Sequence, residues 1–175
     1  MINYKNPKVL FKAARFSLIE HDVDLGDSIF KHQLCTHPGA VVILPLIDKE
    51  TLVLIKNRRY AVAEELWELA AGTLEEGEEP LNAAKRELLE ETGYGAKQFQ
   101  KLTSFYSTPG FCNEKLDLFL ATDLKFYGQN LDQSERITAH KVSLSKALEM
   151  VNSGEICDAK TMLSLLFYKQ FSLRS

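Results

Sequence analysis

The stretch from Gly72 to Tyr94 constrains the fold of this 175-residue chain most, because it predicts a short helix with closely placed carboxylates. Pro80 suits the first position of a helix, where its missing N–H costs nothing. Gly93 suits the position just past the end, where a left-handed residue is favoured. We therefore expect a helix over 80–92, preceded by a loop over 73–79. Apolar residues at helical spacing predict its buried face: Leu81, Ala84 and Leu88.

Three glutamates lie on another face of the same helix. Glu87, Glu90 and Glu91 stand at i, i+3 and i+4, so their carboxylates are neighbours. Like charges so placed cost a few tenths of a kcal/mol each in an isolated helix. One interpretation is a solvated acidic face. The other is a site for a hard divalent cation, usually Mg²⁺, because oxygen ligands would turn the repulsion into coordination.

The complete pattern favours the second interpretation. It reads Gly72, five residues, Glu78, seven residues, Arg86-Glu87-Leu88, one residue, Glu90-Glu91, one residue, Gly93-Tyr94. With roughly 5–7% usage for each specified residue, a chance match has odds of about one in 10⁹ per starting position. The pattern resembles the signature of the Nudix hydrolases, which cleave nucleoside diphosphates linked to another group. Tyr94 departs from it, because that position is usually aliphatic.

This resemblance implies an α/β fold, the Nudix α/β/α sandwich with a mixed central sheet. It also implies that Glu87 and Glu91 are the principal Mg²⁺ ligands, with Glu90 close by and Mn²⁺ as a possible substitute. The backbone carbonyl of Ala71 would complete the ligand set. Arg86 would orient the glutamates through ion pairs, and the alternative for Arg86 is a surface salt bridge of under about 1 kcal/mol.

Two further positions of the pattern have expected structural roles. Glu78 is expected to brace the loop onto the helix, and a catalytic role is the alternative. Gly72 is expected to permit a tight backbone where the strand meets the loop.

Outside the pattern, the resemblance points to the ADP-ribose and nucleotide-sugar pyrophosphatase branch. Pro109 lies sixteen residues past Gly93, within SFYSTPGFCNE, where this branch carries a proline near the substrate; a plain Pro-Gly turn is the alternative. Arg59 matches an arginine that contacts the substrate's phosphates. Glu68 matches a glutamate near the metals, and the alternative is a residue on the polar face of a strand.

Two more carboxylates are candidates. Glu114 would contact the terminal sugar of the substrate. Glu135, in the loop LDQSER, is the candidate general base that activates the attacking water. The base varies within the family, and coupled carboxylates around metals do not titrate independently, so a single base is not required. The implied reaction is hydrolysis of a nucleoside diphosphate sugar such as ADP-ribose to a nucleoside monophosphate and a sugar phosphate. Another Nudix specificity and a non-catalytic nucleotide-sugar sensor remain alternatives.

Composition limits the partners of the chain. A net charge of −3 and a pI near 5.8 argue against a general nucleic-acid binder. No apolar run approaches the roughly 20 residues that span a bilayer, and the N-terminus has no apolar region typical of a signal peptide. The three scattered cysteines indicate reduced thiols in a cytoplasm. We therefore expect a cytoplasmic protein whose partner is a small nucleotide-sugar substrate.

Hydrophobic periodicity and turn residues predict the remaining elements. Strands are expected at 8–21, 27–36, 40–48, 51–59, 66–71, 97–107, 115–124 and 137–144. The run at 40–48 predicts a strand buried on both faces, with 51–59 as its hairpin partner. Ser143 or Ser145 would cap a helix through Asn152, and Asp158 would cap a helix over 159–171. The apolar residues expected to face inward on that last helix are Met162, Leu163, Leu166 and Phe167.

The predicted domain organisation has two parts. Residues 1–38 form an N-terminal antiparallel β extension, and residues 39–175 form the Nudix hydrolase domain. A two-stranded ribbon is marginal alone, so the extension must pack on something. By resemblance it dimerises, reaching over a second subunit of a homodimer; it could equally fold onto its own domain.

Overall fold

Strand β4 (Ala40–Pro45) lies at the centre of the fold, and all of its residues are buried. The computed structural model describes residues 3–131 and 136–172. Within them, β4 pairs in parallel with β9 (Lys115–Phe126) and antiparallel with β7 (Ala70–Thr73). With β8 (Tyr94–Tyr106) they form a mixed sheet in the order β7-β4-β9-β8. The prediction of a strand buried on both faces is confirmed.

A second sheet has the order β10-β5-β6, and its strands are β10 (Ile137–Ser143), β5 (Thr51–Arg59) and β6 (Glu64–Glu68). The predicted hairpin between 40–48 and 51–59 is wrong. In the described part of the chain the two segments are joined by the isolated bridge between Leu46 and Leu52 and by bonds between 47–48 and Thr51, and they form no longer ladder. Both edges of β4 are already occupied by β7 and β9, so β5 pairs elsewhere.

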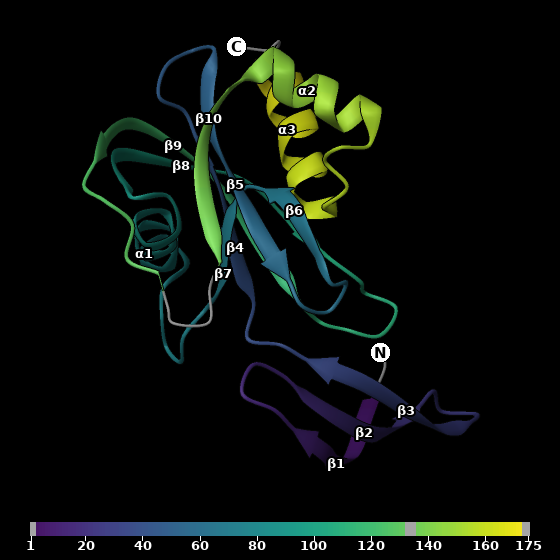
Figure 1. Ribbon diagram of the computed structural model, residues 1–175. Helices are drawn as coiled ribbons and strands as arrows, with labels where there is room; N and C mark the ends of the chain where they lie inside the picture. The colour runs from purple at the N-terminus through teal and green to yellow at the C-terminus, as the bar shows by residue number, and fades with distance from the viewer. Residues whose placement is uncertain (1–2, 132–135, 173–175) are drawn as a thin grey trace.

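Helices cover the two sides of this strand arrangement (Figure 1). On one side lies α1 (Pro80–Thr92); on the other lie α2 (Leu144–Ser153) and α3 (Ala159–Ser172). Val41 and Ile43 of β4 share a core cluster with Leu88 of α1, whereas the alternate residues of β4 share a cluster with α2 and α3. The α/β/α sandwich predicted from the sequence is confirmed.

The segment predicted as one strand over 66–71 is divided between the two sheets. β6 ends at Glu68, and β7 begins at Ala70. The fully buried Leu69 lies between them, and its backbone N–H donates to Thr161 Oγ1 of α3 at 2.8 Å. The chain therefore crosses from one sheet to the other at Leu69, and its backbone is anchored to α3 there.

The N-terminal extension is a three-stranded antiparallel sheet that stands apart from the sandwich (Figure 1). Its strands are β1 (Asn3–Lys12), β2 (Ser17–Asp24) and β3 (Ile29–Thr36). The continuous strand expected over 8–21 is wrong, because the chain turns at 13–16, where the N–H of Ala13 donates to the carbonyl of Phe16. The sequence AARF contains no glycine or proline, so composition gave no turn signal there.

Two predicted buried faces need correction. Leu81 of α1 is 41% exposed, while Ala83, Ala84 and Leu88 are buried. On α3 the expected inward residues Leu163, Leu166 and Phe167 are 36–48% exposed. The buried face of α3 instead carries Thr161, Ser164 and Leu165. The two hydroxyls are tolerated there because both make short hydrogen bonds: Thr161 to Asp158 and Ser164 to the carbonyl of Lys160.

The predicted helix caps are present. Pro80 is at the start of α1, and Gly93 ends it at φ 76° with its N–H bonded to the carbonyl of Leu89. Ser143 caps α2 by accepting from the N–H of Lys146, and Asp158 caps α3 by accepting from the N–H of Thr161. Within the described ranges, no helix is both long and apolar enough to cross a membrane.

Gly93 and Gly154 allow the steric cost of a side chain after α1 to be separated from the cost of the left-handed backbone. Both are left-handed C-caps, at φ 76° and 79°, and alanine at either costs about 1 kcal/mol of backbone strain. A methyl group at position 93 would also lie 2.7–2.9 Å from atoms of Phe126, Gly128 and Gln129. We expect Gly93→Ala to lower the free energy of unfolding by about 2–4 kcal/mol, measured by urea denaturation.

Gly154→Ala is the control, because a methyl group at 154 meets nothing within 4 Å. We expect it to lose only about 1 kcal/mol. Equal losses in the two variants would contradict the prediction that contact with the segment 126–129 adds to the cost of alanine at position 93.

Candidate active site

The glutamates of α1 pack directly against the backbone of β7. Glu87 and Glu91 are 8% and 4% exposed, and the Oε2 of Glu91 accepts from the N–H of Ala71 at 2.9 Å. A methyl group at position 72 would lie 1.8 Å from the Oε1 of Glu87. Gly72 is therefore required by the close approach of a carboxylate, and not by the tight backbone expected from the sequence.

Arg86 links these carboxylates to the loop before the helix. One of its Nη atoms donates to Glu87 Oε1 at 2.6 Å and to Glu90 Oε2 at 3.2 Å. Its Nε and other Nη donate to the two oxygens of Glu78 at 3.0 and 2.9 Å. Glu78 also accepts from the N–H of Glu75 at 3.0 Å, so it braces the loop onto the helix.

The charges of this cluster shift one another's ionisation. The hydrogen bond from Arg86 lowers the pKa of Glu78. The bonds to Glu78, and secondarily to Glu87, raise the pKa of Arg86 well above its usual range. Glu78 and Arg86 are therefore held in their charged forms at neutral pH, and Arg86 is the counter-ion of the acidic face.

The donor set fits a hard cation chemically, because Glu87, Glu90 and Glu91 offer only oxygen ligands and lie together in the wall of one cavity. Among the described residues, no group of three or more acidic, histidine or cysteine side chains stands arranged to hold a metal ion. The contacts explain this: Arg86 binds Glu87 and Glu90, and Glu91 is turned to the N–H of Ala71.

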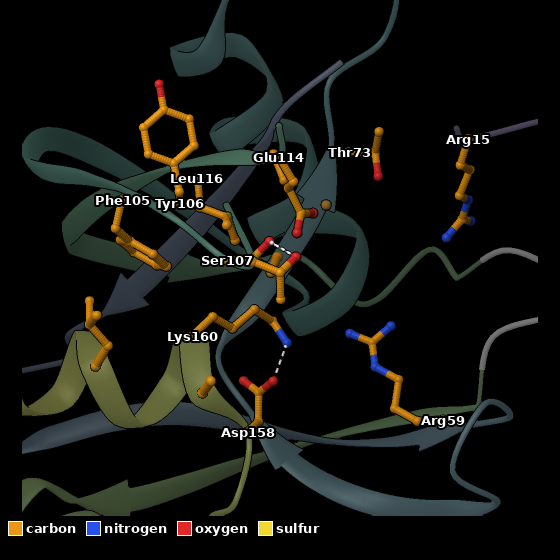
Figure 2. A pocket seen from close by; sticks show the side chains of 16 residues that line it. Arg15, Arg59, Thr73, Phe105, Tyr106, Ser107, Glu114, Leu116, Asp158 and Lys160 are labelled. Atoms are coloured by element: carbon orange, nitrogen blue, oxygen red, sulfur yellow. Dashed lines mark hydrogen bonds and ion pairs between the residues drawn. The ribbon is translucent and has the colours of Figure 1, made fainter. Parts of the chain in front are cut away.

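Two neighbouring cavities open beside β7. The larger, of about 790 Å³, contains Glu87, Glu90 and Glu91 in its wall. The smaller, of about 450 Å³, is drawn in Figure 2 and is lined by Phe105, Glu114 and Lys160, among others. The two share a set of lining residues: Arg15, Arg59, Ala71, Gly72 and Thr73. Together they form a cleft with an acidic end and a mixed polar and apolar end.

Arg59 lies where the two cavities meet, and Glu68 holds it there. Glu68 is fully buried and accepts two hydrogen bonds from Arg59, at 2.7 and 2.6 Å. This contact raises the pKa of Arg59. The prediction placed Glu68 near the metals, but its carboxylate is occupied by Arg59 and by Lys160, whose Nζ lies 2.5 Å away.

Lys160 belongs to a four-membered ionic network with balanced charge. Its Nζ also contacts Asp158 at 2.9 Å, so two carboxylates face two cations: Glu68 and Asp158 against Arg59 and Lys160. In Figure 2, Arg59, Asp158 and Lys160 approach the cavity from β5 and from the start of α3. Burial of Glu68 is tolerated because it is paired twice.

The proline loop contributes neighbours of Pro109 to the cleft. Pro109 itself is exposed and is absent from the described lining of both cavities, whereas Ser107 and Thr108 line the smaller one. Glu114 also lines it, with its Oε1 3.7 Å from His37 Nδ1. The candidate base Glu135 lies outside the described residues. The roles assigned to all these residues stay predictions.

Sequence reasoning missed two cations of the cleft. Arg15 lies in the turn between β1 and β2 and lines both cavities, but the turn itself had no signal in the sequence. Lys160 follows the predicted cap Asp158 by two residues. That spacing could have suggested a side chain at the start of α3, yet not its contact with Glu68, which is 92 residues away.

Comparison with known proteins finds a matching family model and several similar proteins. A family model described as the NUDIX domain matches residues 36–165. The ADP-ribose pyrophosphatase of Bacillus subtilis (strain 168) is 38% identical over 161 residues, which cover 90% of this chain and 87% of that protein. The methanol dehydrogenase activator of Bacillus methanolicus is 32% identical over the same shares of both chains.

A GDP-mannose pyrophosphatase of Escherichia coli O1:K1 / APEC is 36% identical over 143 residues, covering 77% of this chain and 74% of that protein. Among solved structures, the crystal structure of an ADP compounds hydrolase superposes with a TM-score of 0.84 at 21% identity, over 97% of this chain and 93% of that one. This last likeness shows the fold.

Removing the charge of Lys160 tests the buried network. In Lys160→Met, Glu68 keeps Arg59 but loses its second cation inside the protein. We expect the free energy of unfolding to fall by about 1–3 kcal/mol, measured by urea denaturation. The control is Lys146→Met, which removes an exposed ion pair to Glu149 at 3.9 Å and should cost under about 0.5 kcal/mol. Equal losses would show that the contact with Glu68 contributes nothing.

Proposed function

Because the chain belongs to the Nudix family, we propose that it hydrolyses the pyrophosphate bond of nucleoside diphosphate sugars such as ADP-ribose. The products are a nucleoside monophosphate and a sugar phosphate. The observation that carries this proposal is the placement of Glu87, Glu90 and Glu91 at one end of a cleft that has Arg59 at its middle. The names of the relatives in Bacillus subtilis and Escherichia coli support the substrate class.

Mg²⁺, with Mn²⁺ as a possible substitute, is the proposed cofactor, and Glu87, Glu90 and Glu91 would hold it with the carbonyl of Ala71. Such an ion neutralises phosphoryl charge and lowers the pKa of bound water. Arg86 offsets the repulsion among the three carboxylates and, through Glu78, fixes the loop beside them. These contacts set the position of the carboxylates before substrate arrives.

Arg59 is the proposed contact to the diphosphate. A planar guanidinium suits phosphate oxygens, and the two bonds from Glu68 hold this one in a defined orientation. Arg15 lines the same junction from the N-terminal sheet, so a second cation is available to the same group. The diphosphate would then lie between the two cavities, within reach of the acidic end.

The smaller cavity is the proposed site for one end of the substrate. Its wall combines the ring of Phe105 and the side chain of Leu116 with the polar Ser107 and Glu114. A sugar offers an apolar ring face and several hydroxyls, and this lining matches both. Glu114 is the proposed acceptor for sugar hydroxyls, and Glu135 stays the proposed base that activates water.

We also propose that the protein is a cytoplasmic homodimer joined through the extension 1–38, with the domain 39–175 carrying the cleft. Tyr4, Val9 and Phe30 support this: all are apolar, 47–60% exposed, and placed by strand register on one face of the N-terminal sheet. Such a face gains by burial against a second copy. The cysteines of the described chain are free thiols, which supports a reducing compartment.

The catalytic proposal predicts that Glu90→Gln and Glu91→Gln each lower kcat/KM for ADP-ribose by at least about 100-fold in Mg²⁺, because each change removes a negatively charged oxygen ligand. Glu79→Gln is the control: Glu79 is exposed at the start of the same helix and makes no side-chain cap bond. Its kcat/KM should stay within about twofold of wild type.

The assay is phosphate release with a coupled phosphatase on a panel of ADP-ribose, ADP-glucose, GDP-mannose, UDP-glucose, NADH and dinucleoside polyphosphates. Preference for NADH or a dinucleoside polyphosphate would favour another Nudix specificity. Binding without turnover in the wild-type protein would favour a nucleotide-sugar sensor. Undiminished turnover in both glutamine variants would refute the metal role of the helix.

The dimer proposal predicts a molar mass of about twice 19.8 kDa by light scattering. The double variant Val9→Asp with Phe30→Asp should shift the protein to monomer, because it would bury two charges in the interface. Leu25→Asp is the control, since Leu25 is equally exposed but lies in the β2–β3 turn. A monomeric wild-type protein would contradict the proposal.

A further inference from the structure

Two of the three cysteines, Cys35 and Cys112, are neighbours in the fold although 77 positions separate them in the sequence. Cys35 and Cys112 are partners in an isolated parallel β-bridge. The N–H of Cys35 donates to the carbonyl of Phe111 at 2.8 Å, and the N–H of Asn113 donates to the carbonyl of Cys35 at 3.2 Å. Residues paired in this way point their side chains to the same side, about 4.8 Å apart.

That spacing falls within the range of Cα separations, about 4.4–6.8 Å, that a disulfide bridges. Burial and, secondarily, the neighbouring Cys112 thiol raise the pKa of Cys35. The backbone bonds on both sides hold this arrangement without a covalent link. Cys157 is exposed and lies before α3, in a different part of the fold.

We propose that Cys35 and Cys112 form an oxidation site, and that a peroxide converts them to an intramolecular disulfide. Such a bond joins the end of β3 to the loop between β8 and β9. Ser107, Thr108 and Glu114 of that loop region line the smaller cavity. The disulfide would therefore fix one wall of the cleft to the junction between the N-terminal sheet and the sandwich.

The chemistry balances with hydrogen peroxide as the oxidant. The Cys112 thiolate attacks one oxygen, the O–O bond breaks, and hydroxide leaves to give a sulfenic acid. The Cys35 thiol then loses its proton as its sulfur attacks the Cys112 sulfur, the S–S bond forms, the S–O bond breaks, and a second hydroxide leaves. The two thiol protons convert both hydroxides to water. Two electrons pass from the thiols to the peroxide.

Cys112 is assigned the first attack because the raised pKa of Cys35 disfavours the thiolate form of Cys35. The pair is compatible with a reducing compartment, where both thiols persist until peroxide arrives. The inference does not depend on the proposed function, because its readouts are a covalent link and an unfolding temperature.

The test treats dilute full-length protein with hydrogen peroxide at pH 8, blocks remaining thiols with N-ethylmaleimide, and digests with trypsin. We expect one linked species joining peptides 32–49 and 102–115, which dithiothreitol separates. Cys157→Ser should give the same link and Cys112→Ser should give none. A link that includes Cys157, a link between two chains only, or full alkylation of Cys35 and Cys112 after peroxide would overturn the proposal.

A second measurement tests whether the bond fits the fold. A disulfide that closes a 77-residue span without strain should raise Tm by at least about 4 °C over the reduced protein. Cys35→Ser should show no difference between peroxide-treated and untreated samples. An unchanged or lower Tm in oxidised wild type would overturn the claim that the paired backbones already hold the thiols in bonding geometry.

Discussion

The site depends on one close approach: the carboxylate of Glu87 occupies the space where residue 72 would carry a side chain. Any other residue at that position would force the carboxylate of Glu87 away from its place against β7. The hydrogen bond from the N–H of Ala71 to Glu91 requires the same spacing, because it spans only 2.9 Å. Two negative charges are thereby brought against backbone at the sheet, where burial would disfavour them without partners. Arg86 supplies the compensating charge, and its second pair of bonds, to Glu78, orders the loop that leads into the helix.

The helix that carries these carboxylates was predicted well from the sequence because its determinants are local. Pro80 and Gly93 mark the helix ends through backbone chemistry alone, and the spacing of the glutamates follows from 3.6 residues per turn. The strand β4 was equally predictable, because a run of β-branched residues has few alternatives to a strand buried on both faces. The role of Gly72 could not be predicted from the sequence, because it depends on the side chain of Glu87, fifteen positions later, which reaches from the helix to the sheet.

The rest of the fold was set by contacts that local patterns do not contain. The strand expected over 66–71 divides at Leu69 because the backbone N–H of Leu69 bonds to Thr161. The residues around Leu69 give no indication that Thr161 is its partner. The same contact explains the error on α3: once Thr161 and Ser164 have satisfied their hydroxyls, the helix buries them and leaves Leu163 and Leu166 toward the outside. A hydrophobic pattern predicts burial only where polar residues lack better partners.

The crossover Glu68–Thr73 connects the two helical layers. Its first residues bind α3, through Glu68 with Lys160 and Leu69 with Thr161. Its last residues bind α1, through Ala71 with Glu91 and the carbonyl of Thr73 with Arg86. Six consecutive residues thus tie both ends of the cleft to a single stretch of backbone. Glu68 also binds Arg59. The cation at the middle of the cleft and the carboxylates at its acidic end are therefore positioned by contacts to the same stretch of backbone. A substrate that spans the two cavities would therefore meet groups whose relative positions are set by this crossover and not by the flexibility of surface loops.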